Sequence, residues 1–120
     1  MTDISAIIGS IPHQQRKVIN HIVLKFIDSP YIDTVFLFGS CAKGMATDGS
    51  DIDMFVVTKE SIDDDSHEAF HLLHGATDDL PLDDYVSCDV LTATREEFEL
   101  NMTPLIHVIK REGVRLDGLL

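Results

Sequence analysis

Two aspartates separated by one residue are the strongest candidates for chemistry in this sequence. Asp51 and Asp53 lie at the start of an apolar segment, residues 52–57, that has the composition of a β-strand. Side chains two residues apart in a strand share a face, with their Cβ atoms about 6–7 Å apart. Two carboxylates at this separation can hold one or two hard cations, and Mg²⁺ usually takes one or two carboxylates together with substrate phosphates. The alternative is a strand that begins with two solvated acids.

A glycine–serine pair precedes the aspartates and is typical of a phosphate-binding turn. Residues 35–38 form a continuous apolar run, which predicts a strand buried on both faces, and the run ends at Gly39 and Ser40. Because Gly39 has no Cβ, a phosphate can approach backbone N–H groups that suit an anion. Lys43 adds a nearby positive charge. A Walker A loop is excluded, because Gly44 is followed by Met and Ala instead of Lys and Ser or Thr.

A third aspartate, Asp89, lies within a predicted strand over residues 85–91. A carboxylate in an apolar strand is rarely left without a partner. One interpretation is an ion pair with Lys43 or Arg95. The other is a third metal ligand beside the first two aspartates, since adjacent strands lie about 4.8 Å apart.

These residues together carry a family resemblance. Residues 36–57 resemble the minimal nucleotidyltransferases of the polymerase-beta-like superfamily, whose signature is Gly-Ser, about ten residues and Asp-x-Asp. The resemblance extends more loosely through the strand of Asp89, and it favours the metal-ligand interpretation of that residue. The family often has Arg directly after Gly-Ser; here Cys41 takes that place, and Lys43 keeps a charge at the second commonly basic position. The implied nucleotide-binding residues are Gly39, Ser40, Lys43 and Ser50, and the implied catalytic and metal-binding residues are Asp51, Asp53 and Asp89.

The resemblance also implies a fold and a reaction. We expect an α/β domain, with a small mixed sheet of three or four strands and helices packed against it. The expected reaction moves the NMP of an NTP, with ATP the expected nucleotide, to an acceptor hydroxyl with the help of two Mg²⁺ ions. Family relatives of this size commonly pair with a separate helical HEPN-type protein, so an antitoxin-like enzyme acting on such a partner is the first hypothesis. The alternatives are a non-catalytic binding module, and an enzyme that modifies a small hydroxylated compound such as an aminoglycoside.

Length and charge restrict the class of protein. With 120 residues, we expect one domain, residues 1–120. The net charge of −12 disfavours direct binding of a long nucleic acid. No apolar run approaches the length of a membrane span and no signal peptide is evident, so we expect a cytoplasmic protein. Cys41 and Cys88 do not predict a disulfide framework, and Cys88 is expected to behave as a small buried apolar residue.

Apolar periodicity and capping residues predict the remaining elements. A segment with three histidines, His67, His71 and His74, is a further candidate helix and a weaker candidate zinc site, because no fourth ligand is evident. Apart from that segment, the sequence predicts helices over about 13–28, 95–101 and 104–113, and strands over 34–38, 52–58, 85–91 and 114–116.

Overall fold

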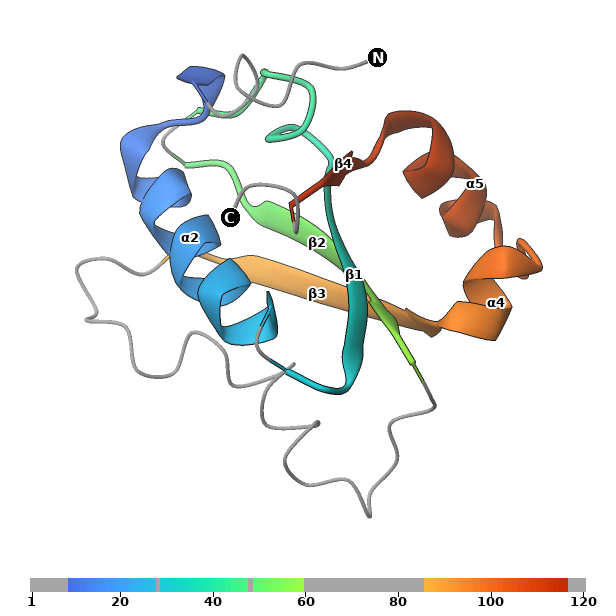
Figure 1. Ribbon diagram of the computed structural model, residues 1–120. Helices are drawn as coiled ribbons and strands as arrows, with labels where there is room; N and C mark the ends of the chain where they lie inside the picture. Colours follow the sequence, from blue (N-terminus) through green and yellow to red (C-terminus); the bar gives the residue numbers. More distant parts are fainter. Residues whose placement is uncertain (1–8, 28, 48, 60–85, 117–120) are drawn as a thin grey trace.

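A four-stranded mixed sheet forms the centre of the fold, as the computed structural model shows (Figure 1). The structure describes residues 9–27, 29–47, 49–59 and 86–116. Strand β2 lies between β1, which runs antiparallel to it, and β3, which runs parallel, while β4 pairs antiparallel with the outer side of β1. The strands are β1 (Ile32–Phe38), β2 (Ile52–Thr58), β3 (Cys88–Thr94) and β4 (Val114–Arg115).

Helix α2 (His13–Ile27) covers one face of the sheet. Its apolar side chains recur with helical spacing and form one stripe, so they meet alternate residues of β1 and β2. We call this group the first cluster. Its fully buried members include Ile19, Ile22, Phe26, Leu37, Ile52 and Met54.

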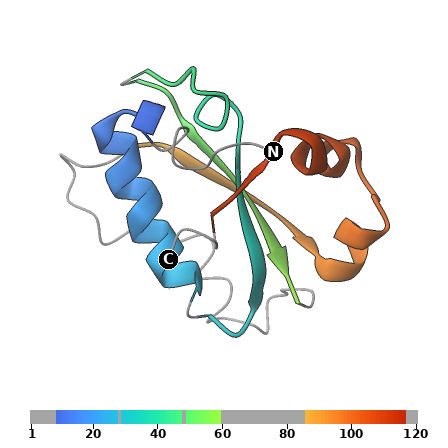
Figure 2. The same cartoon turned by 45° about the horizontal axis from the view of Figure 1, so that its top comes forward.

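Helices α4 (Arg95–Glu99) and α5 (Pro104–Glu112) cover the opposite face, as Figures 1 and 2 show from two directions. The second cluster consists of Phe55, Val57, Ile106 and Ile109, with Phe36 and Phe98 among the side chains packed around it. The Phe98 ring of α4 lies 5.5 Å from that of Phe36 and 6.1 Å from that of Phe55, between ring centroids. Aromatic contact therefore holds the short helix α4 against the sheet.

Local sequence explains where these two helices begin. Thr94 accepts a hydrogen bond from the backbone N–H of Glu97, whose carboxylate accepts one from the N–H of Thr94, so a capping box opens α4. Thr103 caps α5 in a similar way through the N–H of Ile106, with proline in the first turn. Both N-termini were predicted at these positions, and the structure confirms them.

The predicted α/β class and mixed sheet are confirmed, and two strand boundaries are corrected. Strand β1 begins at Ile32, before the predicted 34, and β3 runs over Cys88–Thr94 instead of 85–91. The later end of β3 follows from its partner, because β2 continues to Thr58, which pairs with Thr94. The histidine segment 67–74 lies outside the described residues. No helix in the described part of the chain is long and apolar enough to cross a membrane.

Truncating Phe26 tests the packing of α2. Phe26 is completely buried, so Phe26→Ala should lower the free energy of unfolding by about 3–5 kcal/mol through lost burial and a cavity. Leu24 lies on the same helix and is 57% exposed, so Leu24→Ala should stay within about 0.5 kcal/mol of the wild type. Urea denaturation of both variants measures the difference. Equal losses in the two variants would contradict this orientation of α2.

Candidate active site

Strand register brings the predicted residues from three segments together at one end of the sheet. Asp53 of β2 pairs directly with Asp89 on the parallel strand β3, and on its other side Asp53 pairs with Phe38, the last residue of β1. Directly paired residues on neighbouring strands point to the same face. Asp51 lies just before β2, two residues ahead of Asp53. Asp51 and Asp89 are exposed, whereas Asp53 is half-buried.

Gly39 lies against the carboxylate of Asp53. Its φ is 74°, a conformation that L-residues with a side chain rarely adopt, and a Cβ at this position would overlap the Oδ2 atom of Asp53. Glycine is therefore required here for two reasons, the backbone conformation and the space beside the carboxylate. The contact also places the start of the Gly-Ser turn next to the row formed by Asp53 and Asp89.

The turn after Gly39 is closed by its own backbone. The N–H of Lys43 donates to the carbonyl oxygens of Gly39 and Ser40, at 3.2 Å to each, and the N–H of Met45 donates to Ser40 at 3.0 Å. This is the turn that the sequence predicted behind the glycine. The side chain of Lys43 points into solvent, half exposed, and its Nζ atom lies 3.8 Å from Oε2 of Glu112 in α5.

Ser50 organises the loop that leads to Asp51. Its hydroxyl accepts a hydrogen bond from the N–H of Thr47 at 2.8 Å, and its own N–H donates to the carbonyl of Thr47 at 2.9 Å. These contacts give Ser50 a structural role in the loop. Binding of nucleotide by Ser50 stays a prediction.

Gln15 positions the same loop from helix α2 and was missed in the sequence. Its side chain is completely buried, and Nε2 donates to the carbonyl oxygens of Thr47 at 2.7 Å and Ser50 at 3.1 Å. The start of α2 is thereby tied to the segment just before Asp51. One signal was available: Gln15 is a polar residue three positions before Val18, on the apolar stripe of the helix.

Burial and two neighbouring carboxylates raise the pKa of Asp53. Its partial burial is the main cause, and the carboxylates of Asp89 and Asp51 add to it by disfavouring a further negative charge nearby. On the opposite face of β3, burial and the nearby acids raise the pKa of Cys88 to about 12. Cys88 is therefore a thiol at neutral pH, as expected for an apolar packing residue. Burial, with Asp53 nearby, also raises the pKa of the fully buried Cys41.

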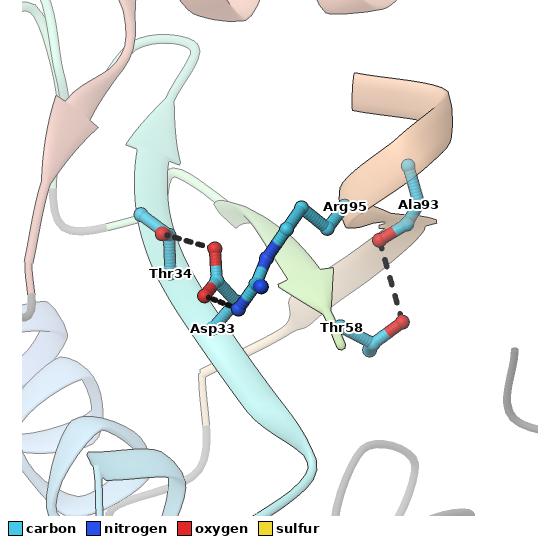
Figure 3. A network of polar contacts seen from close by, with 5 residues as sticks. All are labelled: Asp33, Thr34, Thr58, Ala93 and Arg95. Atoms are coloured by element: carbon cyan, nitrogen blue, oxygen red, sulfur yellow. Dashed lines mark hydrogen bonds and ion pairs between the residues drawn. The ribbon is translucent and has the colours of Figure 1, made fainter. Parts of the chain in front are cut away.

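Neither of the two bases considered as ion-pair partners for Asp89 contacts it. Arg95 pairs with Asp33 of β1, and Lys43 is next to Glu112. Figure 3 shows the Arg95 network at the far end of the sheet, where Thr34 also donates to Asp33 and Thr58 donates to the carbonyl of Ala93. The ion-pair interpretation of Asp89 is therefore wrong for these two bases.

The donor set of this site suits a hard cation. Carboxylate oxygens are the ligands that Mg²⁺ prefers, and Mg²⁺ often needs only one or two of them because phosphates and water complete its coordination. Within the described ranges, no three Asp, Glu, His or Cys side chains converge into a ready-made metal cage. The arrangement of Asp51, Asp53 and Asp89 therefore fits Mg²⁺ that arrives with a phosphate ligand better than a metal held by protein alone.

Comparison with known proteins agrees with this geometry. The sequence model of the family described as "Polymerase beta, Nucleotidyltransferase" matches residues 20–113. The chain belongs to this nucleotidyltransferase family. None of the curated proteins matches the chain. Among solved structures, a protein from Sulfolobus solfataricus assigned as a nucleotidyltransferase is similar, with a TM-score of 0.55 and 21% sequence identity.

The similarity to the Sulfolobus protein covers 96% of this chain and 89% of that one. At this level of identity it supports the fold alone. The family match covers the Gly-Ser turn, Asp51, Asp53 and Asp89. Membership in the nucleotidyltransferase family supports nucleotidyl transfer as the class of reaction.

Replacing Gly39 tests its contact with Asp53. Gly39→Ala should lower the free energy of unfolding by about 1–2 kcal/mol from the left-handed backbone alone, with a further loss from the overlap with the carboxylate. Gly49→Ala is the matched control, because a Cβ at Gly49 meets nothing within 4 Å. Chemical denaturation of both variants measures the two losses. A Gly39→Ala protein as stable as the Gly49→Ala protein would contradict the close approach.

The raised pKa of Asp53 predicts a pH dependence for the metal-free protein. When the pKa of an acid is higher in the folded chain than in the unfolded chain, the acid contributes stability that is fully present below the unfolded pKa, here 3.8. This contribution is lost as the pH rises through the folded pKa. The stability of Asp53→Asn relative to wild type should therefore increase as the pH rises from below 3.8 to neutral. Thermal melts in a chelating buffer across this range measure the difference.

Asp33→Asn is the control of opposite sign. The hydrogen bond from Arg95 lowers the pKa of Asp33, so its stabilising contribution is present above 3.8 and is lost as the pH falls through the lower folded value. The stability of Asp33→Asn relative to wild type should therefore decrease as the pH rises. The same pH trend in both variants would refute the raised pKa of Asp53.

Proposed function

We propose that this protein is a Mg²⁺-dependent nucleotidyltransferase that transfers the NMP of an NTP, with ATP the expected nucleotide, to an acceptor hydroxyl. The observation that carries the proposal is the direct pairing of Asp53 with Asp89, with Asp51 two residues before it and Gly39 against its carboxylate. This row offers oxygen ligands on β2 and β3 and a phosphate-binding turn after β1. An enzyme needs these groups to transfer a nucleotidyl group from one oxygen to another.

Each residue has a role in this proposal. The turn at Gly39 and Ser40 binds the phosphates that leave, and Lys43 adds positive charge at the rim. Asp51 and Asp53 would hold the two Mg²⁺ ions, and Asp89 would help to hold one of them and accept the hydroxyl proton. When bound, the ions supply charge neutralisation at the attacking and leaving oxygens. Ser50 contributes through the loop that it closes ahead of Asp51.

The acceptor in this proposal belongs to a helical HEPN-type partner protein, and the chain acts on it as an antitoxin. The net charge of −12 supports a basic partner, because complementary charge favours encounter. Long nucleic acids are disfavoured by the same charge. We propose a cytoplasmic location for this reaction.

A non-catalytic binding module is the second candidate, and Cys41 is the observation that favours it. Cys41 is completely buried, with its Sγ atom 3.9 Å from the carbonyl oxygen of Asp51, so it places no charge in the turn. Lys43, the base of this turn, is next to the negative charge of Glu112. A module of this kind would neutralise its partner by contact without turnover.

Asparagine substitution separates the two candidates. The double variant Asp51→Asn, Asp53→Asn should lose label transfer from each NTP by at least about a hundredfold, because the groups proposed to hold the metal are removed. The fold should remain, since both amides match the carboxylates in size. Incubation with labelled NTP, Mg²⁺ and a cell lysate measures transfer, and Glu99→Gln, at an exposed position of α4, is the control for loss of one acid. Wild-type rates in the double variant would refute the enzyme assignment. No transfer by the wild type, with partner binding retained, would favour the module.

A further inference from the structure

A groove of about 500 Å³ lies on the face of the sheet that carries Asp53 and Asp89. The pairs Asp53–Asp89, Phe55–Leu91 and Val57–Ala93 follow one another along β2 and β3 and share this face. The floor of the groove includes Phe55, Leu91 and Ala93, so it starts one pair beyond the two acids. Helices α4 and α5 form its walls.

Two of the three polar side chains that line the groove, those of Glu97 and Thr103 but not of Thr92, already serve within the protein. The carboxylate of Glu97 accepts from the N–H of Thr94, and the hydroxyl of Thr103 accepts from the N–H of Ile106, so both serve as helix caps. Leu91, by contrast, is 45% exposed on the floor. A polyhydroxylated ligand would lose water here and find few hydrogen-bond partners, whereas an apolar body would gain by burial.

The position of the groove indicates which reactant it serves, if the proposed function holds. In phosphoryl transfer the attacking and leaving oxygens lie roughly in line on opposite sides of the phosphorus. The phosphates that leave are assigned to the turn at Gly39, on the β1 side of Asp53, so the acceptor enters from the β3 side. The groove is on that side and begins directly after Asp89.

We propose that this groove binds the acceptor and selects a hydroxyl carried on an apolar body, either on a small molecule or on a protein side chain. The body lies over Leu91 and Phe55. Two strand residues span about 6.6 Å, so the hydroxyl extends about this far from the Leu91 position to reach Asp89. This inference rests on the proposed function and adds the class of acceptor to it. Sugars and aminoglycosides do not belong to that class.

Acceptor choice by the wild-type protein is the first test. With labelled ATP and Mg²⁺, transfer to 2-phenylethanol and 4-methylphenol should exceed transfer to glucose and glycerol by about tenfold or more. In a lysate, label in the small-molecule or the protein fraction identifies the source of the acceptor, and the labelled hydroxyl should sit on an apolar body in either case. Preferential labelling of a sugar hydroxyl would overturn the groove proposal and leave the nucleotidyltransferase proposal standing.

Binding without turnover is the second test, and it separates the two proposals. The dissociation constant of 2-phenylethanol is measured by ligand-observed NMR with Mg²⁺ and a non-hydrolysable ATP analogue. Leu91→Gln should weaken binding by about tenfold, whereas Leu24→Gln, the same change at an exposed position of α2, should leave it unchanged. No binding by the wild type, or equal binding by both variants, would overturn the groove. Binding as expected without any transfer would overturn the enzyme assignment alone.

Discussion

Strand β2 has an antiparallel neighbour on one side and a parallel neighbour on the other, and its register with both sets the positions of Asp53, Asp89 and the turn at Gly39. One side of Asp53 meets the end of β1, where the chain turns at Gly39, and the other side meets Asp89. A shift of one residue in either pairing would turn a carboxylate or the turn to the wrong face. The buried residues of β2 pack into clusters on both faces, so the register is fixed by the hydrophobic interior and not by the acids themselves.

The acids in turn impose a cost on the sheet that the rest of the fold must offset. Asp53 is half-buried beside two other carboxylates, and its pKa is raised first by this burial and then by repulsion from Asp89 and Asp51. At the far end of the sheet the charges are complementary, since Arg95 pairs with Asp33. One end of the sheet therefore holds like charges without a basic partner among the described residues, and the other holds a matched pair. Clustered acids with a perturbed pKa are typical of functional sites.

Much of this arrangement could be predicted from local sequence. The Gly-Ser turn, the spacing of Asp51 and Asp53, and the caps at Thr94 and Thr103 are short-range signals, and the structure has the turn and both caps where they were predicted. What could not be predicted depends on residues far apart in the chain. Gln15 bonds to carbonyls 32 and 35 positions away, and Arg95 to an acid 62 positions away. The late end of β3 likewise followed from its pairing with β2, because Thr92 to Thr94 carry no strong apolar signal of their own.

The sheet separates two hydrophobic clusters of unequal size, and this inequality bears on how the molecule opens. Among the described residues, sixteen buried side chains form the cluster under α2, and four form the one under α4 and α5. Local opening requires less free energy where fewer apolar contacts must be broken. The C-terminal helices should therefore exchange their amide hydrogens before α2 and the central strands do. The wall of the groove is then the part of the fold that can yield while the strands that carry the carboxylates stay folded.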